Sequence, residues 1–286
     1  MKINYVSGGE FQSFYANRQC LENKVKISAS GSSKEDIKKN KKLNEDKTKK
    51  AVVTASFFGA VVPVVISNIL KGKGGALLDT LKNSSSVKNK LKAGIDMFEI
   101  KDFGQILAST SGGIAGGITA GVITDKNPNN REPKYREGIF EFLNNMIPTS
   151  FVALGEHFIE NYEEKLKSAA KTIPEADKNK IKIMRAALIA VSVAGGMFIA
   201  NKTSNKINED IFDKNKEEND NETKIKRERK FKIQDCFVHL DDLIGLFVLS
   251  KSPALNKIAT SIQMDKILPF LYAKSGYEAG ISRDEE

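Results

Sequence analysis

The sequence predicts an all-α membrane protein with glycine-zipper-like helix hairpins rich in small residues, followed by a more polar helical C-terminal part. The main evidence is two long stretches without a charged side chain, residues 51–70 and 104–124. A third stretch, 181–200, is uncharged from Ala186 onward. A helix rises about 1.5 Å per residue, so twenty residues span the roughly 30 Å of a bilayer core. We therefore expect residues 51–200 to form helical hairpins embedded in a membrane.

The composition excludes several classes of protein. Of the 286 residues, 40% are hydrophobic and 28% are charged, which argues against wholesale disorder. The net charge of +9 comes almost entirely from lysine, which suits diffuse attraction to anionic surfaces better than base recognition in a nucleic acid. Cys20 and Cys236 are too few for a disulfide scaffold.

The first uncharged stretch has lysines at both of its ends. They are Lys49 and Lys50 before residue 51, and Lys71 and Lys73 after residue 70. Long lysine side chains can place their charges among lipid headgroups while the stem lies along the apolar segment. Twenty residues are too many for one strand, so the stretch is predicted to be a membrane-spanning helix.

The second uncharged stretch consists mainly of Gly, Ala, Ser and Thr. Gly113, Gly117 and Gly121 recur every four residues and share one helical face, and a second row lies beside it, formed by Gly112, Gly116 and Ala120. Such rows let another helix approach closely, which is the small-xxx-small mode of membrane helix association. We expect 104–124 to pack against 51–70 through this groove.

The third uncharged stretch repeats the pattern of small residues. It begins beside Lys182 and Arg185, which are expected to flank the membrane, and its helix-packing glycines are predicted to be Gly195 and Gly196. Its small residues form two rows: Ala186, Ala190 and Ala194, and Ser192, Gly196 and Ala200. The amphipathic segment 139–159 is expected to be its partner in the second hairpin.

The remaining segments are polar. Residues 1–50 are predicted to be a flexible, lysine-rich segment without a cleavable secretion signal, and 201–232 a charged linker. Residues 233–286 are expected to form amphipathic helices on the membrane surface. The distribution of lysines favours a cytoplasmic location for both termini.

No catalytic, metal or cofactor site is predicted. Asp102–Gly104 matches a kinase DFG triplet, but no H-R-D triplet accompanies it. His157 and Glu160 share a helix face and form at most half of a metal site. Four side chains that can bind metals lie close together in the sequence: Cys236, His239, Asp241 and Asp242. Cys236, His239 and Asp242 could share one helix face and supply three metal ligands. The more ordinary interpretation is an amphipathic helix with an acidic face.

Three hypotheses for function remain open. The first is a non-enzymatic membrane protein that acts through helix association, as a scaffold or by binding a partner, with Gly113, Gly117 and Gly121 as its contact surface. Its partners would be the lipid bilayer, anionic headgroups, and a second copy or another membrane protein, with no nucleic acid. The second is a channel or carrier for a small solute, with a path lined by Ser109, Thr110, Ser111 and Asn144. The third is a soluble all-α protein with buried glycine-rich helices.

Overall fold

The computed structural model describes residues 34–169, 172–213 and 263–283, together with Val248, Leu249, Lys257 and Ser261. The chain divides into two units, residues 1–47 and 48–286, each considered by itself. The described part of the first unit is the beginning of helix α2 (Lys34–Asn68). The flexibility of residues 1–50 stays a prediction.

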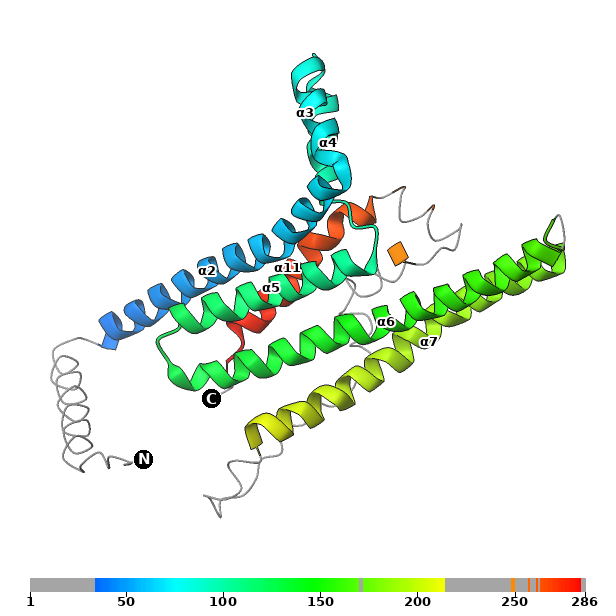
Figure 1. The fold of residues 1–286 in the computed structure, drawn as a ribbon. Coiled ribbons are helices and arrows are strands. Elements are labelled where there is room, and N and C mark those ends of the chain that lie inside the picture. Colours follow the sequence, from blue (N-terminus) through cyan, green and yellow to red (C-terminus); the bar gives the residue numbers. More distant parts are fainter. Residues whose placement is uncertain are drawn as a thin grey trace, which may run out of the picture. The chain divides into compact units, whose positions relative to one another are not determined.

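All regular elements among the described residues are helices, as the sequence predicts. The apolar part of α2 lies in the second unit and continues into the π-helical turn η1 (Figure 1). The elements that follow are η1 (Ile69–Lys73), α3 (Gly74–Asn83), α4 (Val87–Ile95), η2 (Asp96–Phe98), α5 (Phe103–Thr124), η3 (Pro128–Asn130), α6 (Arg131–Ala169), α7 (Glu175–Asn208), η4 (Glu209–Asp213) and α11 (Met264–Ile281).

The long helices form two antiparallel pairs. In the first pair α2 lies along α5, so that Gly59 faces Gly112 and Ala55 faces Gly116. In the second pair α7 returns along α6, with Gly196 against Pro148 (Figure 1). These are the pairings that the sequence analysis expects for the two hairpins.

Helix α11 does not lie at the periphery, where the sequence analysis expected the C-terminal part. It packs along α5 in the same direction and also contacts α6. Its residues Leu268, Tyr272 and Ala279 are fully buried. The expectation was wrong for this helix because its small residues, notably Gly276 and Gly280, allow it to approach α5 closely.

The bundle has two distinct ends. At one end, here called the hairpin end, α2 gives way to the α3–α4 hairpin, and the backbone N–H of Ile100 donates a 2.8 Å hydrogen bond to the carbonyl of Asp265 near the start of α11. At the opposite end, Arg136 near the start of α6 binds Asp213, just beyond α7.

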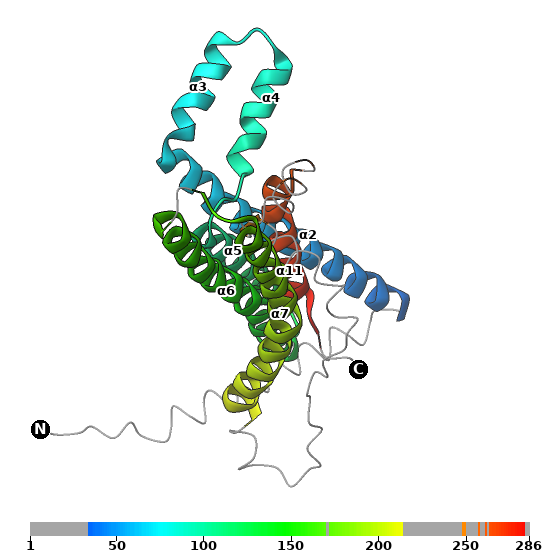
Figure 2. The same ribbon diagram turned by 90° about the vertical axis from the view of Figure 1, so that its right-hand side faces the viewer.

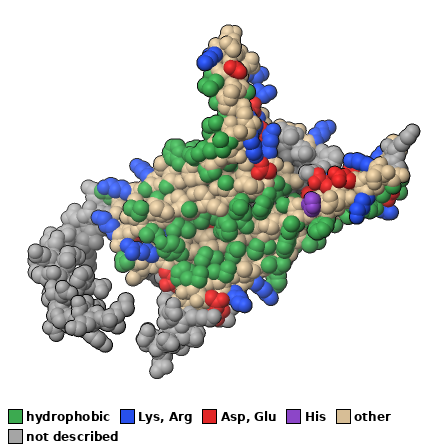
Figure 3. Space-filling model, in the orientation of Figure 1, with side chains coloured by type: hydrophobic (Ala, Val, Ile, Leu, Met, Phe, Trp, Pro, Cys, Tyr) green, Lys and Arg blue, Asp and Glu red, His purple; other side chains and the backbone are tan. Residues whose placement is uncertain are grey.

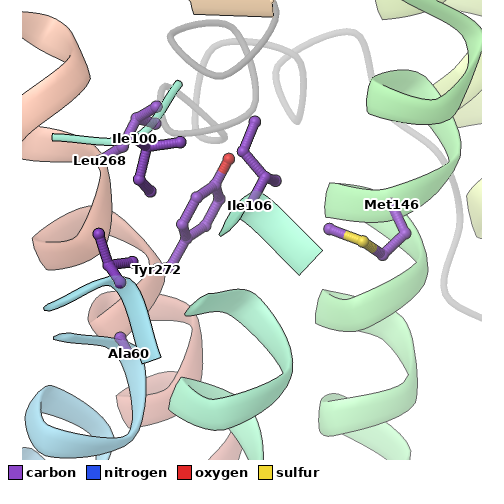
Figure 4. Close-up of a cluster of buried hydrophobic side chains, with 7 residues drawn as sticks. Ala60, Ile100, Ile106, Met146, Leu268 and Tyr272 are labelled. Carbon is purple, nitrogen blue, oxygen red and sulfur yellow. The ribbon is translucent and has the colours of Figure 1, made fainter. Parts of the chain in front are cut away.

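A cluster of buried apolar side chains holds α2, α5, α6 and α11 together near the hairpin end. Tyr272 of α11 lies between Ile106 of α5 and Ala60 of α2, as Figure 4 shows. Aromatic rings extend this packing, because Phe270 of α11 lies 5.7 Å from the ring of Phe57 and 5.6 Å from that of Phe98. The cluster consists of Ala60, Val64, Ile100, Ile106, Met146, Leu268 and Tyr272.

Among the described residues, three helical segments are long and apolar enough to cross a membrane: Lys42–Asn83, Phe103–Thr124 and Glu175–Asp213. In their most apolar windows only 33%, 39% and 33% of residues are buried inside the protein. Large apolar side chains therefore lie exposed over these helices and over α6, as Figure 3 shows for one face. Among them are Val53, Phe58, Val62 and Ile66 of α2, Phe151, Leu154 and Phe158 of α6, and Val191, Phe198 and Ile199 of α7.

Candidate functional site

The glycine row of α5 lies directly against the backbone of α11. A Cβ atom added at Gly113, Gly117 or Gly121 would lie within 3.0 Å of a backbone atom of α11. Real Cβ atoms essentially never make contacts shorter than 3.0 Å. The hypothetical distances are 2.8 Å from Gly113 to the Tyr272 carbonyl oxygen, 2.6 Å from Gly117 to the Gly276 carbonyl carbon, and 3.0 Å from Gly121 to the Gly280 carbonyl carbon. Only glycine fits at these positions without displacing a backbone.

The contact between α5 and α11 is reciprocal. A Cβ at Gly276 would lie 3.0 Å from the amide nitrogen of Ile114, and one at Gly280 would lie 2.7 Å from the carbonyl carbon of Gly117. Gly276 and Gly280 form a G-x-x-x-G pair, a signal that was not used when residues 233–286 were interpreted only as amphipathic helices. Both helices therefore contribute glycines to one seam.

The second small-residue row of α5 receives α2. A Cβ at Gly112 would lie 3.0 Å from the carbonyl carbon of Gly59, and one at Gly116 would lie 3.0 Å from that of Ala55. Ser109 Oγ donates a 2.8 Å hydrogen bond to the carbonyl of Ala60 and fixes the register of the two helices. Helix α5 thus lies between α2 and α11, and both of its rows are occupied within the chain.

The two predicted packing glycines of α7 have different surroundings. A Cβ at Gly196 would lie 2.8 Å from Cα of Pro148 on α6, and Ser192 and Ala200 of the same row are also buried. At Gly195 the nearest atom is Cγ1 of Val191, in the same helix, at 4.0 Å. The other row of α7, Ala186, Ala190 and Ala194, is exposed. Only the row containing Gly196 is used in the contact with α6.

Most of the predicted flanking lysines lie at the surface. Lys49, Lys50, Lys71 and Lys182 are exposed, and Lys71 forms an ion pair with Asp102. Lys73 is half-buried and lies 2.6 Å from a carboxylate oxygen of Glu99. Lys71 and Lys73 lie in η1, directly after α2, whereas Lys49 and Lys50 lie within α2 and Lys182 lies within α7. The exposed lysines can place their charges in solvent.

Arg185 differs from the other predicted flanking residues. Its side chain is only 9% exposed, and it binds two carboxylates of α6, Glu156 at 3.0 Å and Glu163 at 3.3 Å. It therefore joins α6 to α7, a contact that its expected place beside the membrane does not predict. The sequence could not reveal this pairing, because the partners lie 22 and 29 residues away along the chain.

One face of α6 carries polar side chains into the interior of the bundle. Asn145 Nδ2 donates hydrogen bonds to the Glu141 carbonyl at 2.8 Å and to Ser275 Oγ of α11 at 3.3 Å. Buried polar groups are costly unless they are paired, so this face needs its partners on α5, α7 and α11. The buried polar residues of α6 are Lys134, Glu141, Asn144, Asn145, Thr149 and Glu156.

Lys134 forms hydrogen bonds that link three segments at the end of the bundle opposite the hairpin. Its fully buried ammonium group donates to Asp125 Oδ2 at 3.0 Å, to the Asn130 carbonyl at 3.2 Å and to the Ser282 carbonyl at 2.9 Å. Burial alone would raise the pKa of Asp125, but the hydrogen bonds from Lys134, from the Asn127 backbone and from Asn130 outweigh it and hold the pKa below its usual value. This ion pair ties the α5–α6 connection to the chain just after α11.

A pocket of about 620 Å³ lies between the base of the α3–α4 hairpin and the start of α11. Four of its charged groups form two ion pairs: Lys73 binds Glu99, and Lys266 binds Asp96. Burial opposes ionisation of Glu99, yet hydrogen bonds from Lys73 and Lys101 outweigh this effect and lower its pKa. Ion pairs beside this pocket therefore link the base of the hairpin to the rest of the bundle.

The candidate metal ligands of the sequence analysis do not come together in the described part of the chain. His157 is exposed, and its Nε2 lies 3.3 Å from Asn161 Nδ2. Among the described residues no group of three or more His, Cys, Asp and Glu side chains is placed to hold a metal ion. The candidates Cys236, His239, Asp241 and Asp242 lie outside the described residues.

No family model, curated protein or solved structure matches this chain. Function is therefore inferred from the geometry of the chain itself.

Proposed function

We propose that this chain is a non-enzymatic integral membrane protein that acts through helix association, as a scaffold or by binding a partner helix. The observation that carries the proposal is the arrangement of its apolar helices, whose tightest backbone contacts lie inside while large apolar side chains remain outside. Extended apolar surfaces are rare on soluble monomers. Lipid tails are the natural surroundings of such a surface, which disfavours the soluble alternative.

The surface proposed for association is the outer face of α7. The glycine rows of α5 are already filled by α2 and α11, so they are not available to another molecule. On α7, Ala186, Ala190 and Ala194 form an exposed row four residues apart, and Gly195 beside them has no close neighbour outside its own helix. A row of small residues permits close approach of a helix from a second copy or from another membrane protein.

The proposed orientation has both ends of the chain in the cytoplasm. The inner regions 34–50, 125–138 and 201–235 carry eight, four and ten Lys and Arg, compared with seven in 71–103 and six in 159–182. An excess of positive charge on the cytoplasmic side is the usual pattern in membrane proteins. The hairpin end would then face away from the cytoplasm.

Site-specific photo-crosslinking in membranes tests the proposal. A photoreactive residue at position 190 should form an adduct with a protein, either a second copy or another chain, because a helix packs on this row. The control places the same residue at position 58, where Phe58 is 57% exposed on α2, and should capture lipid. Adducts with lipid alone at both positions would contradict association through α7, and adducts with neither would contradict insertion.

A channel or carrier is the second candidate, favoured by the polar face of α6. Glu141, Asn144 and Asn145 are buried there, and carboxylates within membrane proteins are costly and often functional. The residues expected to line a path have mixed positions: Ser109 is bonded to α2, Thr110 is buried and Ser111 is half-buried. Flux of a small cation into proteoliposomes that is lost in Glu141→Gln would favour this candidate over the first.

A further inference from the structure

The α3–α4 hairpin is an amphipathic element with little support from the rest of the protein. Its two helices have ten and nine residues, which is too short for stability in water without packing. Yet its largest apolar side chains are exposed, with Val87 at 80% and Leu91 at 64%. None of the residues of either helix is buried. The hairpin therefore needs surroundings that cover its apolar face.

The direction of the hairpin is fixed at its base. Gly72 has φ 89°, a left-handed conformation that favours glycine, and it turns the chain out of the direction of α2. Lys73 donates to Glu99 and to the Asp96 carbonyl, while Lys266 of α11 binds Asp96. Figures 1 and 2 show that the hairpin consequently runs across the direction of α5, α6 and α7 where α2 ends, while α6 and α7 continue beyond it.

The apolar side of the hairpin is continuous with the apolar surface of α2. Exposed Leu78 and Leu81 of α3 and Val87 and Leu91 of α4 follow the apolar residues at the end of α2, where Leu70 is also exposed. In Figure 3 hydrophobic side chains follow one edge of the hairpin and run on toward α2, while lysines stand mainly along the other edge. An element that lies across the bundle at its end, with this division of side chains, matches the level of lipid headgroups.

The charge of the hairpin indicates which surface it meets. Residues 74–95 contain four lysines, Lys82, Lys88, Lys90 and Lys92, and one acidic residue, Asp79. All five side chains lie on exposed or half-buried positions. A helix pair with leucines on one side and lysines on the other is typical of peripheral binding to anionic membranes.

We propose that the α3–α4 hairpin is an interfacial anchor that lies in the headgroup region and binds anionic lipid in the leaflet at the hairpin end, which the proposed orientation places away from the cytoplasm. The proposal rests on the proposed membrane insertion, since the bundle direction sets the membrane normal. Leu78, Leu81, Val87 and Leu91 enter the boundary of the acyl chains, and the lysines contact anionic headgroups. A lysine near an anionic leaflet contributes about fivefold to the docking equilibrium.

Tryptophan fluorescence provides the test, because the chain contains no Trp and each introduced Trp reports alone. The full chain is reconstituted in vesicles of phosphatidylcholine, with or without phosphatidylserine, carrying bromine at a shallow or a deep acyl position. Leu81→Trp reports the apolar side of the hairpin, with Leu91→Trp as a second reporter should the first variant not fold. Asn89→Trp is the matched control on the polar side, and Phe58→Trp reports the membrane-spanning part of α2.

The proposal expects shallow bromine to quench Leu81→Trp several-fold more strongly than Asn89→Trp, and phosphatidylserine to increase this quenching. Replacing Lys88, Lys90 and Lys92 by Gln should remove the increase. If Phe58→Trp is quenched by deep bromine but Leu81→Trp responds only to acrylamide in the water, the anchor is overturned and the proposed insertion stands. If Leu81→Trp is shielded from both quenchers, a protein covers the hairpin and the lipid proposal is likewise overturned. If Phe58→Trp is not quenched by lipid, the insertion itself is refuted.

Discussion

Replacement of Gly117 by alanine tests the glycine seam most sharply. A Cβ at this position would lie 2.6 Å from the carbonyl carbon of Gly276 and 2.6 Å from Oγ of Ser56, whereas ordinary contacts begin at 3.4 Å. The seam must therefore open by about 0.8 Å or more. The atom of α11 that blocks the methyl group belongs to the backbone and cannot turn aside, so a whole helix has to move.

The magnitude follows from two opposing effects. Overpacking of a tight interior costs about 3 kcal/mol at the upper end of its usual range, which fits a clash with backbone. Alanine recovers up to about 1 kcal/mol relative to glycine through its higher helix propensity. The net loss of about 2 kcal/mol corresponds to roughly a 30-fold shift of the folding equilibrium.

The assay is reversible unfolding of the purified protein in mixed micelles. The fraction of dodecyl sulfate is increased stepwise, and circular dichroism measures the helix content of the protein at each step. Gly195→Ala is the matched control, because its nearest neighbour is Val191 of its own helix at 4.0 Å. The control should be unchanged, or more stable by up to about 1 kcal/mol. Equal stability of the two variants would refute the argument that close backbone contact at Gly117 stabilises the bundle.

Three further predictions concern the charged groups. Arg185→Met should cost about 3 kcal/mol or more because it leaves Glu156 buried without its cation, and the double variant with Glu156→Met should recover much of that loss in the same unfolding assay. Because the pKa of Glu99 is lowered in the folded protein, its ionised form stabilises the hairpin base above about pH 4.5, and this contribution is lost as the pH falls through the lowered pKa. Hydrogen exchange in α4 of the wild type, corrected for the intrinsic rate, should therefore accelerate in acid. In Glu99→Gln the corrected exchange should be fast at every pH. Lys134→Met should lower the free energy of unfolding by about 2 kcal/mol and speed hydrogen exchange near the end of α11. Unchanged exchange there would contradict the role of the hydrogen bond from Lys134 to the Ser282 carbonyl.

Periodicity and composition were enough to predict the long apolar helices and the pairing of α2 with α5 and of α6 with α7. Uncharged runs of bilayer length identify the apolar part of α2 and the whole of α5. The four-residue spacing of glycines identifies the two faces of α5, because glycine is costly in a helix unless close packing offsets it. Both kinds of information are local, so they can be taken from the sequence directly.

The positions of α11 and Arg185 could not be predicted in the same way. The partner of Gly276 is Gly113, and the partners of Arg185 lie on another helix, so both depend on how distant segments meet. The G-x-x-x-G pair of α11 was visible in the sequence, but it does not state which helix it contacts. The direction of the α3–α4 hairpin likewise depends on Gly72 and on ion pairs to η2 and α11.

Alkaline carbonate extraction of membranes from cells that express the full chain tests the central claim most directly. High pH opens vesicles and releases proteins held only by charge, whereas helices with exposed apolar faces in lipid remain in the membrane pellet. The account predicts that the chain stays in the pellet and is released only by detergent. Recovery of the chain in the carbonate supernatant would contradict the assignment of its exposed apolar surface to lipid.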